Sequence, residues 1–309
     1  MGTTLNYRKS ILCITAMILF SILFPYIVTC AKIRSDTGRI YTPKASGRTV
    51  VLDGSVKLDM EEFIPCVLYA MLPYEYEEEA LKAQIVIIRT YIMLKMGQNN
   101  EISGSELGLP YTTYADLEKE WGRDYEKLYN YTNKLINNTE MQVIKYEGQL
   151  IHPYYHEISE GTTCEGEQPY LKPVESSSDI SADNYLGITY FTKDEVIAKI
   201  KAACGVELKP EELISKITVN KCENSNYVKT VSVGEAVISG EDFMKTFSLV
   251  SGSYTVEEFA EGIKMVSKGI GSGKGLSLFG AKKMAEQGTG YMDIIRHYYS
   301  GVEVVSEKP

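Results

Sequence analysis

Residues 77–96 constrain the fold most, because they are typical of a helix yet leave almost no polar face. Glu78 falls in the first turn, where the helix dipole favours a carboxylate, and it stands four residues before Lys82, which suits an ion pair. Apolar side chains fill residues 85–88 and most positions after them. A helix that is apolar on every side has to be buried. We therefore predict a central core helix that stops at Gly97.

The remaining pattern predicts shorter elements around this helix. Strands are expected at residues 49–57, 142–146, 150–155 and 217–237. Helices are expected at residues 126–137, 192–204, 240–249, 280–287 and 291–299, with an apolar-periodic segment at 61–71. Glu147-Gly148 favours a hairpin, and residues 98–125 are rich in turn residues without a clear pattern. The simplest assembly is a single α+β domain of helices and mostly antiparallel strands.

Composition narrows the possible partners. The chain of 309 residues carries a formal net charge of -9 and has no long basic run, which argues against nucleic acid and against a polybasic grip on anionic lipid. Its 23 tyrosines, against 8 phenylalanines and one tryptophan, suit the half-buried wall of a glycan groove. They suit ordinary strands equally well.

The N-terminus is typical of a membrane anchor. Residues 10–31 contain no charged side chain and would form roughly 33 Å of helix, which spans a bilayer core. Arg8 and Lys9 precede this run, as in a signal peptide. We predict a cytoplasmic tail at 1–9, a transmembrane signal anchor at 10–31 and a polar linker at 32–48. A lipoprotein signal that ends at Cys30 is the alternative.

Six cysteines are spread along the chain without CxxC spacing, at Cys13, Cys30, Cys66, Cys164, Cys204 and Cys222. A zinc ribbon is therefore unsupported. A disulfide between Cys204 and Cys222 would suit an exported domain, and the sequence leaves that pairing open.

Residues 70–91 read AMLPYEYEEEALKAQIVIIRTY. This segment resembles the signature A-E-M-P-x-x-(F/Y/W)-x-x-E-A-L-K-A-Q-x-x-A-A-R-T-Y of the stage II sporulation protein D (SpoIID/LytB) family. Further blocks that resemble the same family follow in the same order, at residues 147–163, 169–176, 269–281 and 297–301. The resemblance covers about residues 49–305 and implies a domain that acts on peptidoglycan.

The resemblance implies a lytic transglycosylase, in which one glutamate first protonates the leaving oxygen and then accepts the proton of the sugar's 6-hydroxyl. That position is Met71 here, and a thioether can do neither. Glu160, Ser272 and Leu278 also replace the family's Gly, His and Gln. We therefore expect a retained fold that binds glycan strands with impaired catalysis. The alternative is an active enzyme with a displaced acid, for which Glu75 is the fallback.

The family blocks also imply which residues line a substrate groove. Matching positions place Gln84, Arg89, Tyr91, Ser159 and Ser277 there. The guanidinium of Arg89, on a buried helix, needs a carboxylate or carbonyl partner. A buried ion pair and a role in shaping the groove both remain open.

A third alternative is a zinc-dependent hydrolase. Some clostridial relatives bind zinc near the second block, and His152, His156 and Cys164 could supply three ligands there. The opposing interpretation is ordinary strand histidines beside a free thiol, with no cofactor.

The resemblance further implies a bacterial, single-pass membrane protein whose main domain is extracytoplasmic and whose role is related to sporulation. The expected partners are peptidoglycan glycan strands, with other cell-wall or sporulation proteins as further candidates. Nucleic acid is not expected as a partner.

Overall fold

The computed structural model describes residue 20 and residues 41–52 and 55–307. The predicted cytoplasmic tail, the membrane anchor and most of the linker therefore lie outside the described residues. Within the described ranges, no helix is both long and apolar enough to cross a membrane.

Helix α3 is the centre of the larger hydrophobic core, as the sequence predicts. It spans Glu78–Met96, is buried on nearly all sides, and ends at Gly97 with a φ of 59°. Its neighbours in the core are α2 (Met60–Met71), β4 (Gln142–Tyr146), α10 (Leu278–Glu286) and α11 (Tyr291–Tyr298). The predicted pair of Glu78 with Lys82 is present at 2.6 Å.

Short strands and helices complete this half of the molecule, which we call the helical lobe (residues 49–151 and 278–306). The predicted strand at 49–57 is a hairpin of β1 (Thr49–Leu52) and β2 (Val56–Asp59). Strand β4 pairs with β5 (Gln149–Leu150) and β14 (Glu303–Ser306). The region without a clear pattern contains β3 (Glu101–Ser103), α4 (Gly104–Leu107), α5 (Tyr114–Trp121) and η1 (Gly122–Asp124), followed by α6 (Tyr125–Asn138).

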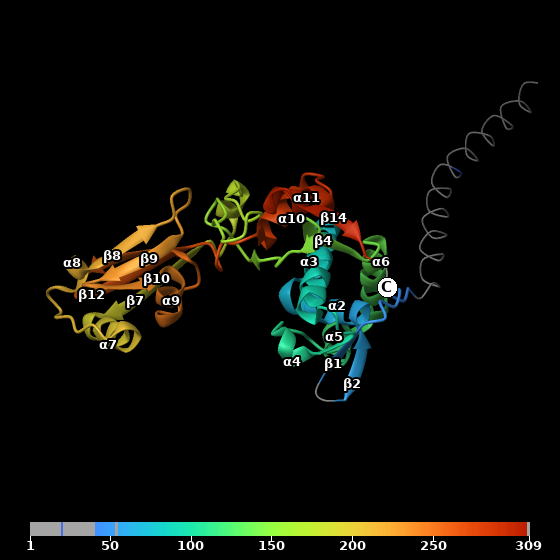
Figure 1. Ribbon diagram of the computed structural model, residues 1–309, viewed down its shortest axis with the longest axis horizontal. Helices are drawn as coiled ribbons and strands as arrows, with labels where there is room; N and C mark the ends of the chain where they lie inside the picture. Colours follow the sequence, from blue (N-terminus) through green and yellow to red (C-terminus); the bar gives the residue numbers. More distant parts are fainter. Residues whose placement is uncertain (1–19, 21–40, 53–54, 308–309) are drawn as a thin grey trace, which may run out of the picture.

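A second core belongs to residues 186–268, which we call the sheet lobe (Figure 1). Its two antiparallel sheets contain β7 (Leu186–Thr192), β11 (Ser253–Phe259) and β12 (Gly262–Lys268) in one, and β8 (Ile217–Lys221), β9 (Val228–Val233) and β10 (Ala236–Ser239) in the other. The helices are α7 (Lys193–Cys204), α8 (Leu213–Lys216) and α9 (Gly240–Thr246). The α+β class with mostly antiparallel sheets is confirmed, although β7, β11 and β12 were not predicted.

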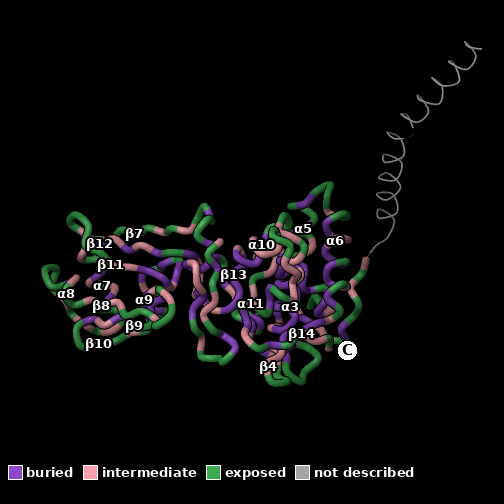
Figure 2. Tube along the Cα trace, turned by 90° about the horizontal axis from the view of Figure 1, so that it is seen from above, coloured by how far each residue is buried: buried purple, intermediate pink, exposed green. Residues whose placement is uncertain are grey.

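A junction (residues 152–185 and 269–277) lies between the two lobes in both views (Figures 1 and 2). Its regular elements are β6 (Tyr155–His156), η2 (Ser177–Ser181) and β13 (Leu276–Ser277). Strands β6 and β13 pair in parallel, which joins the second family-like block to the glycine-rich one.

Candidate functional site

The glycine-rich block lies flat against the second block of the junction. The register places Leu276 opposite Tyr155 and Ser277 opposite His156. Gly275 has a φ of 70°, and a Cβ there would lie 1.9 Å from the carbonyl oxygen of Tyr154. Only glycine allows two backbones to approach so closely in this conformation. The alternating glycines therefore build the junction and do not form a phosphate loop.

Asp179 ties the blocks of the junction together. Its Oδ2 accepts hydrogen bonds from the backbone N–H of Ser159 and from the hydroxyl of Ser277, both at 2.7 Å. The Ser277 hydroxyl also accepts from the N–H of Gly280 and so caps α10. Burial raises the pKa of the Asp179 carboxyl, and the serine hydrogen bonds oppose that rise. The sequence analysis missed this residue.

Both predicted groove serines are thus fully buried, and so are two further predicted groove residues, Gln84 and Arg89. Arg89 forms a bidentate ion pair with Glu61, with both N–O distances at 2.7 Å. It also donates to the carbonyl oxygen of Gln142 and the hydroxyl of Thr139. These contacts occupy the guanidinium within the protein. Of the two roles left open for Arg89, the structure provides the buried ion pair.

Met71, at the position of the family acid, is the last residue of α2 and is partly exposed. The amide Nε2 of buried Gln84 lies 3.5 Å from its sulfur. The Gln84 Oε1 is also buried, and no hydrogen-bond partner for it occurs in the described part of the chain. A thioether is a weak acceptor, so this amide is poorly satisfied. The surroundings of Met71 would therefore suit a carboxyl group, which could accept from Nε2 or donate to Oε1.

Tyr91 is partly exposed and ties α3 to the junction. Its hydroxyl donates to the carbonyl oxygen of Leu107 at 2.9 Å, and its ring meets the His152 ring edge to face at 5.4 Å. Of the five residues predicted to line a groove, it is the one with exposed surface.

Tyr76 and Glu157 lie on the surface near the ends of α2 and α10. Burial raises the pKa of the Tyr76 phenol, and the negative charge of Glu157 adds to that rise. The Lys282 Nζ lies 5.2 Å from the centre of the Tyr76 ring. Glu157 is exposed and stands where the family-like block has a serine after its histidine. This mismatch with the family-like block points to Glu157, which sequence reasoning missed. Glu157 is a second candidate for the acid, in addition to Glu75.

The fallback acid, Glu75, lies in an exposed turn after Pro73. Its carboxylate is hydrogen-bonded to Tyr74 and raises the pKa of that phenol. Glu79, at the start of α3, already has partners within the protein. It accepts a hydrogen bond from the N–H of Tyr291 and forms an ion pair with Lys82.

The three predicted zinc ligands face different surroundings. The His156 Nδ1 contacts the carbonyl oxygen of Lys274 at 3.1 Å, and burial lowers the pKa of this imidazole to about 4. His152 stacks on Tyr154, with ring centres 4.1 Å apart. The Cys164 sulfur lies 3.9 Å from that of Cys222. Within the part of the chain that the structure describes, no three His, Cys, Asp or Glu side chains are grouped to hold a metal.

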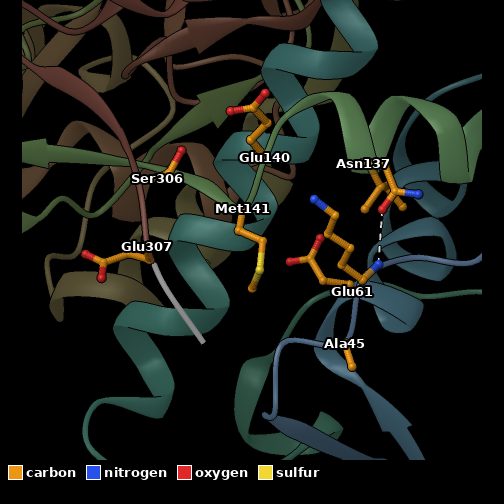
Figure 3. Close-up of a pocket in the computed structure, with 9 residues that line it drawn as sticks. Ala45, Glu61, Asn137, Glu140, Met141, Ser306 and Glu307 are labelled. Atoms are coloured by element: carbon orange, nitrogen blue, oxygen red, sulfur yellow. Dashed lines mark hydrogen bonds between the residues drawn. The ribbon is translucent and has the colours of Figure 1, made fainter.

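A pocket of about 580 Å³ opens elsewhere, between the start of the domain and its end (Figure 3). Its lining residues are Lys44, Ala45, Glu61, Ile136, Asn137, Glu140, Met141, Ser306 and Glu307. None of the residues predicted for the active site belongs to this lining. The pocket therefore adds nothing to the chemistry at Met71.

Comparison with known proteins finds the same family that the sequence blocks resemble. The family model "Stage II sporulation protein" (SpoIID) matches residues 51–146, which hold α2, α3 and the Arg89–Glu61 pair. The chain is similar to this family, as the sequence blocks predicted.

The stage II sporulation protein D of Bacillus amyloliquefaciens is 29% identical over 80% of this chain and 74% of its own length. The protein of the same name from Bacillus subtilis (strain 168) is 28% identical with the same coverage. A protein called amidase enhancer from Bacillus subtilis is 25% identical over 76% of this chain and 39% of its own length.

Proposed function

We propose that this chain is a membrane-anchored cell-wall protein of sporulation whose extracytoplasmic domain binds peptidoglycan glycan strands with impaired cleavage. Similarity to the stage II sporulation protein D family supports the link to sporulation and the cell wall. The observation that carries the proposal is Met71 at the family acid's position, with Gln84 directed at its sulfur from 3.5 Å. General acid catalysis needs an exchangeable proton within hydrogen-bond reach, and this side chain has none.

The relative named amidase enhancer supports a second kind of partner. We propose that a cell-wall amidase is one of the wall proteins that this domain engages. A domain that binds glycan without cutting it could hold such an enzyme on its substrate. Glycan binding and amidase binding would then be separable activities.

The proposed loss of cleavage is tested with purified sacculi. The full chain in detergent micelles is incubated with them, and the soluble products are analysed for 1,6-anhydro muropeptides. We expect products at the level of the buffer control, together with sedimentation of the protein with the sacculi. Anhydro products well above that control would overturn the proposal, and failure to co-sediment would remove the glycan-binding part.

One specific observation favours a second candidate, an active transglycosylase with a displaced acid. Glu157 lies near Tyr76, on the same surface as the end of α2. If cleavage is found, Glu157→Gln and Glu75→Gln identify the acid, because the variant that lacks it loses about 10²-fold or more in rate. Equal rates in both variants would remove both residues from this role.

The zinc-dependent hydrolase remains a proposal with a direct test. Metal analysis of the purified chain, before and after dialysis against a chelator, measures the zinc content. A stoichiometry near zero in protein prepared with zinc in the medium would remove this candidate. In a separate experiment, accessibility of the domain to protease added outside intact cells tests the proposed extracytoplasmic location.

A further inference from the structure

A joint of close contacts fixes the sheet lobe to the junction. The backbone N–H and the side-chain amide of Asn226 donate to the two carboxylate oxygens of Glu160, at 3.0 and 3.1 Å. The N–H of Glu160 donates in turn to the hydroxyl of Tyr227 at 3.1 Å. Glu160 is buried, and both donors to its carboxylate are neutral groups of Asn226 in the sheet lobe. Glu160 stands where the family-like block has glycine. Its hydrogen bonds attach the sheet lobe to the junction.

The ring of Tyr227 lies directly on the glycine-rich block. A Cβ at Gly273 would stand 2.0 Å from the Tyr227 Cζ, and Gly273 has a φ of 76°. The turn before β9 therefore packs against the junction without space for a side chain at position 273. That turn begins at Cys222, whose N–H donates to the carbonyl oxygen of Tyr227 at 2.8 Å.

Two thiols face each other across this joint. The sulfurs of Cys164 and Cys222 lie 3.9 Å apart, although the residues are 58 positions apart in the sequence. Cys164 is held on the junction side, because its N–H donates to the carbonyl oxygen of Gly273 at 2.7 Å. Both cysteines line a cleft of about 480 Å³ between the junction and the sheet lobe, together with Ser272 and Lys274. A reagent in the cleft can reach Cys222, which is partly exposed.

We propose that Cys164 and Cys222 form a disulfide that locks the sheet lobe to the junction. A bonded pair of sulfurs is about 2.05 Å apart, so the two thiols, now 3.9 Å apart, have to approach each other before the bond can form. Disulfides persist in extracytoplasmic compartments, where the proposed function places this domain. The pairing differs from the predicted Cys204–Cys222 bond, because the Cys204 thiol donates to the carbonyl oxygen of Ile200 within α7.

The oxidant is a small-molecule or protein disulfide, and the reaction is thiol–disulfide exchange. The thiolate of Cys222 attacks one sulfur of the oxidant, which forms a mixed disulfide and releases one thiol. Cys164 then loses its proton, attacks the Cys222 sulfur and releases the second thiol. Two protein thiols thereby lose two protons and two electrons, and the oxidant's disulfide becomes two thiols. Burial raises the pKa of the Cys164 thiol to about 12, which favours this order of attack.

Peptide mapping of the full chain tests the disulfide. The protein in detergent is incubated with oxidised glutathione, its remaining thiols are alkylated under denaturing conditions without reductant, and the tryptic peptides are weighed. We expect one linked species that joins the Cys164 and Cys222 peptides, lighter by two hydrogens than their sum. Cys66 and Cys204 should be alkylated. Separate alkylated peptides for Cys164 and Cys222, or a link from Cys222 to Cys204, would overturn the proposal.

Cysteine variants provide the matched controls. The variant Cys204→Ser should keep the linked species, and both Cys164→Ser and Cys222→Ser should lose it. In wild type and in Cys204→Ser, adding dithiothreitol should lower the unfolding temperature by several degrees, because the disulfide restrains the unfolded chain. The same addition should leave Cys164→Ser unchanged. Equal sensitivity of all three proteins to the reductant would contradict the proposal, even where a variant is less stable from the outset.

Discussion

The helical lobe and the sheet lobe bury different kinds of groups. The helical lobe surrounds a single helix, α3, and holds the Arg89–Glu61 ion pair inside its core with side chains at most 2% exposed. The ion pairs of the sheet lobe lie at the surface, such as Lys193 with Glu258. Strand β7 even exposes Leu186, Ile188 and Tyr190 to solvent. The family model matches only within the helical lobe.

The two lobes contribute different features: the helical lobe holds the position of the family acid, and the sheet lobe holds contacts that attach it to the junction. The position of the family acid and the Gln84 amide beside it belong to the helical lobe. The sheet lobe contributes the turn that carries Asn226 and Tyr227, and this turn contacts the junction through Glu160. We expect the largest loss of stability from a substitution in the core of the helical lobe, and smaller losses from substitutions in the junction.

The largest effect is expected for Arg89→Ala. It leaves the carboxylate of Glu61 buried without its partner, which should lower the free energy of unfolding by about 3–5 kcal/mol. Denaturant unfolding measures the change. The control is Lys57→Ala, which breaks an exposed pair with Glu101 and should cost at most about 1 kcal/mol. Similar losses in both variants would show that the buried pair does not organise the helical lobe.

A pH-dependent loss of stability is expected from His156 in the junction. Its pKa is lowered from 6.5 to about 4 by burial, so the unfolded chain binds a proton between these values while the folded chain does not. Stability is therefore complete above pH 6.5 and is lost as the pH falls toward 4, by about 3 kcal/mol over this window.

Unfolding of His156→Gln and of the control His297→Gln at several pH values measures this contribution. The first variant should flatten the dependence between pH 6.5 and 4. The second should retain it, because His297 is partly exposed. An unchanged slope in His156→Gln would contradict the buried, neutral state of this imidazole.

Gly273→Ala tests the contact between the junction and the sheet lobe, and its expected effect on stability is smaller. The new methyl group would meet the ring of Tyr227 in a left-handed conformation, with an expected cost of about 1–3 kcal/mol. Gly205→Ala is the matched control, since Gly205 has a similar φ of 75° and no atom within 4 Å of the added Cβ. A larger loss at 273 isolates the contact between the junction and the sheet lobe, whereas equal losses would show that this contact is loose.

Sequence reasoning succeeded where the signal is local. The buried helix at 77–96 was predicted within one residue, because its apolar pattern and its end at Gly97 lie in one continuous segment. Strands β11 and β12 were missed, since the turn between them uses Ala260 at a φ of 51° and offers no usual turn signal before it. Strand β7 was also missed, because its exposed positions are themselves apolar.

The site was predicted less completely than the fold, because its contacts join distant positions. Asp179 is 20 residues from Ser159 and 98 from Ser277, so no spacing rule connects them. The two serines were singled out from the family blocks as groove residues, but both are buried and hydrogen-bonded to Asp179. Tertiary packing decides whether a polar side chain faces a substrate or another residue, and the sequence does not contain that information locally.

Met71 removes the family acid from surroundings in which Gln84 could hydrogen-bond a carboxyl group. The direct measurement is the yield of 1,6-anhydro muropeptides from sacculi treated with Met71→Glu, compared with wild type and with Met71→Gln. We expect products for the glutamate variant, about 10²-fold or more above the other two, because Gln84 can hydrogen-bond the new carboxyl group. Equal yields from all three proteins, with the variants still folded, would contradict it.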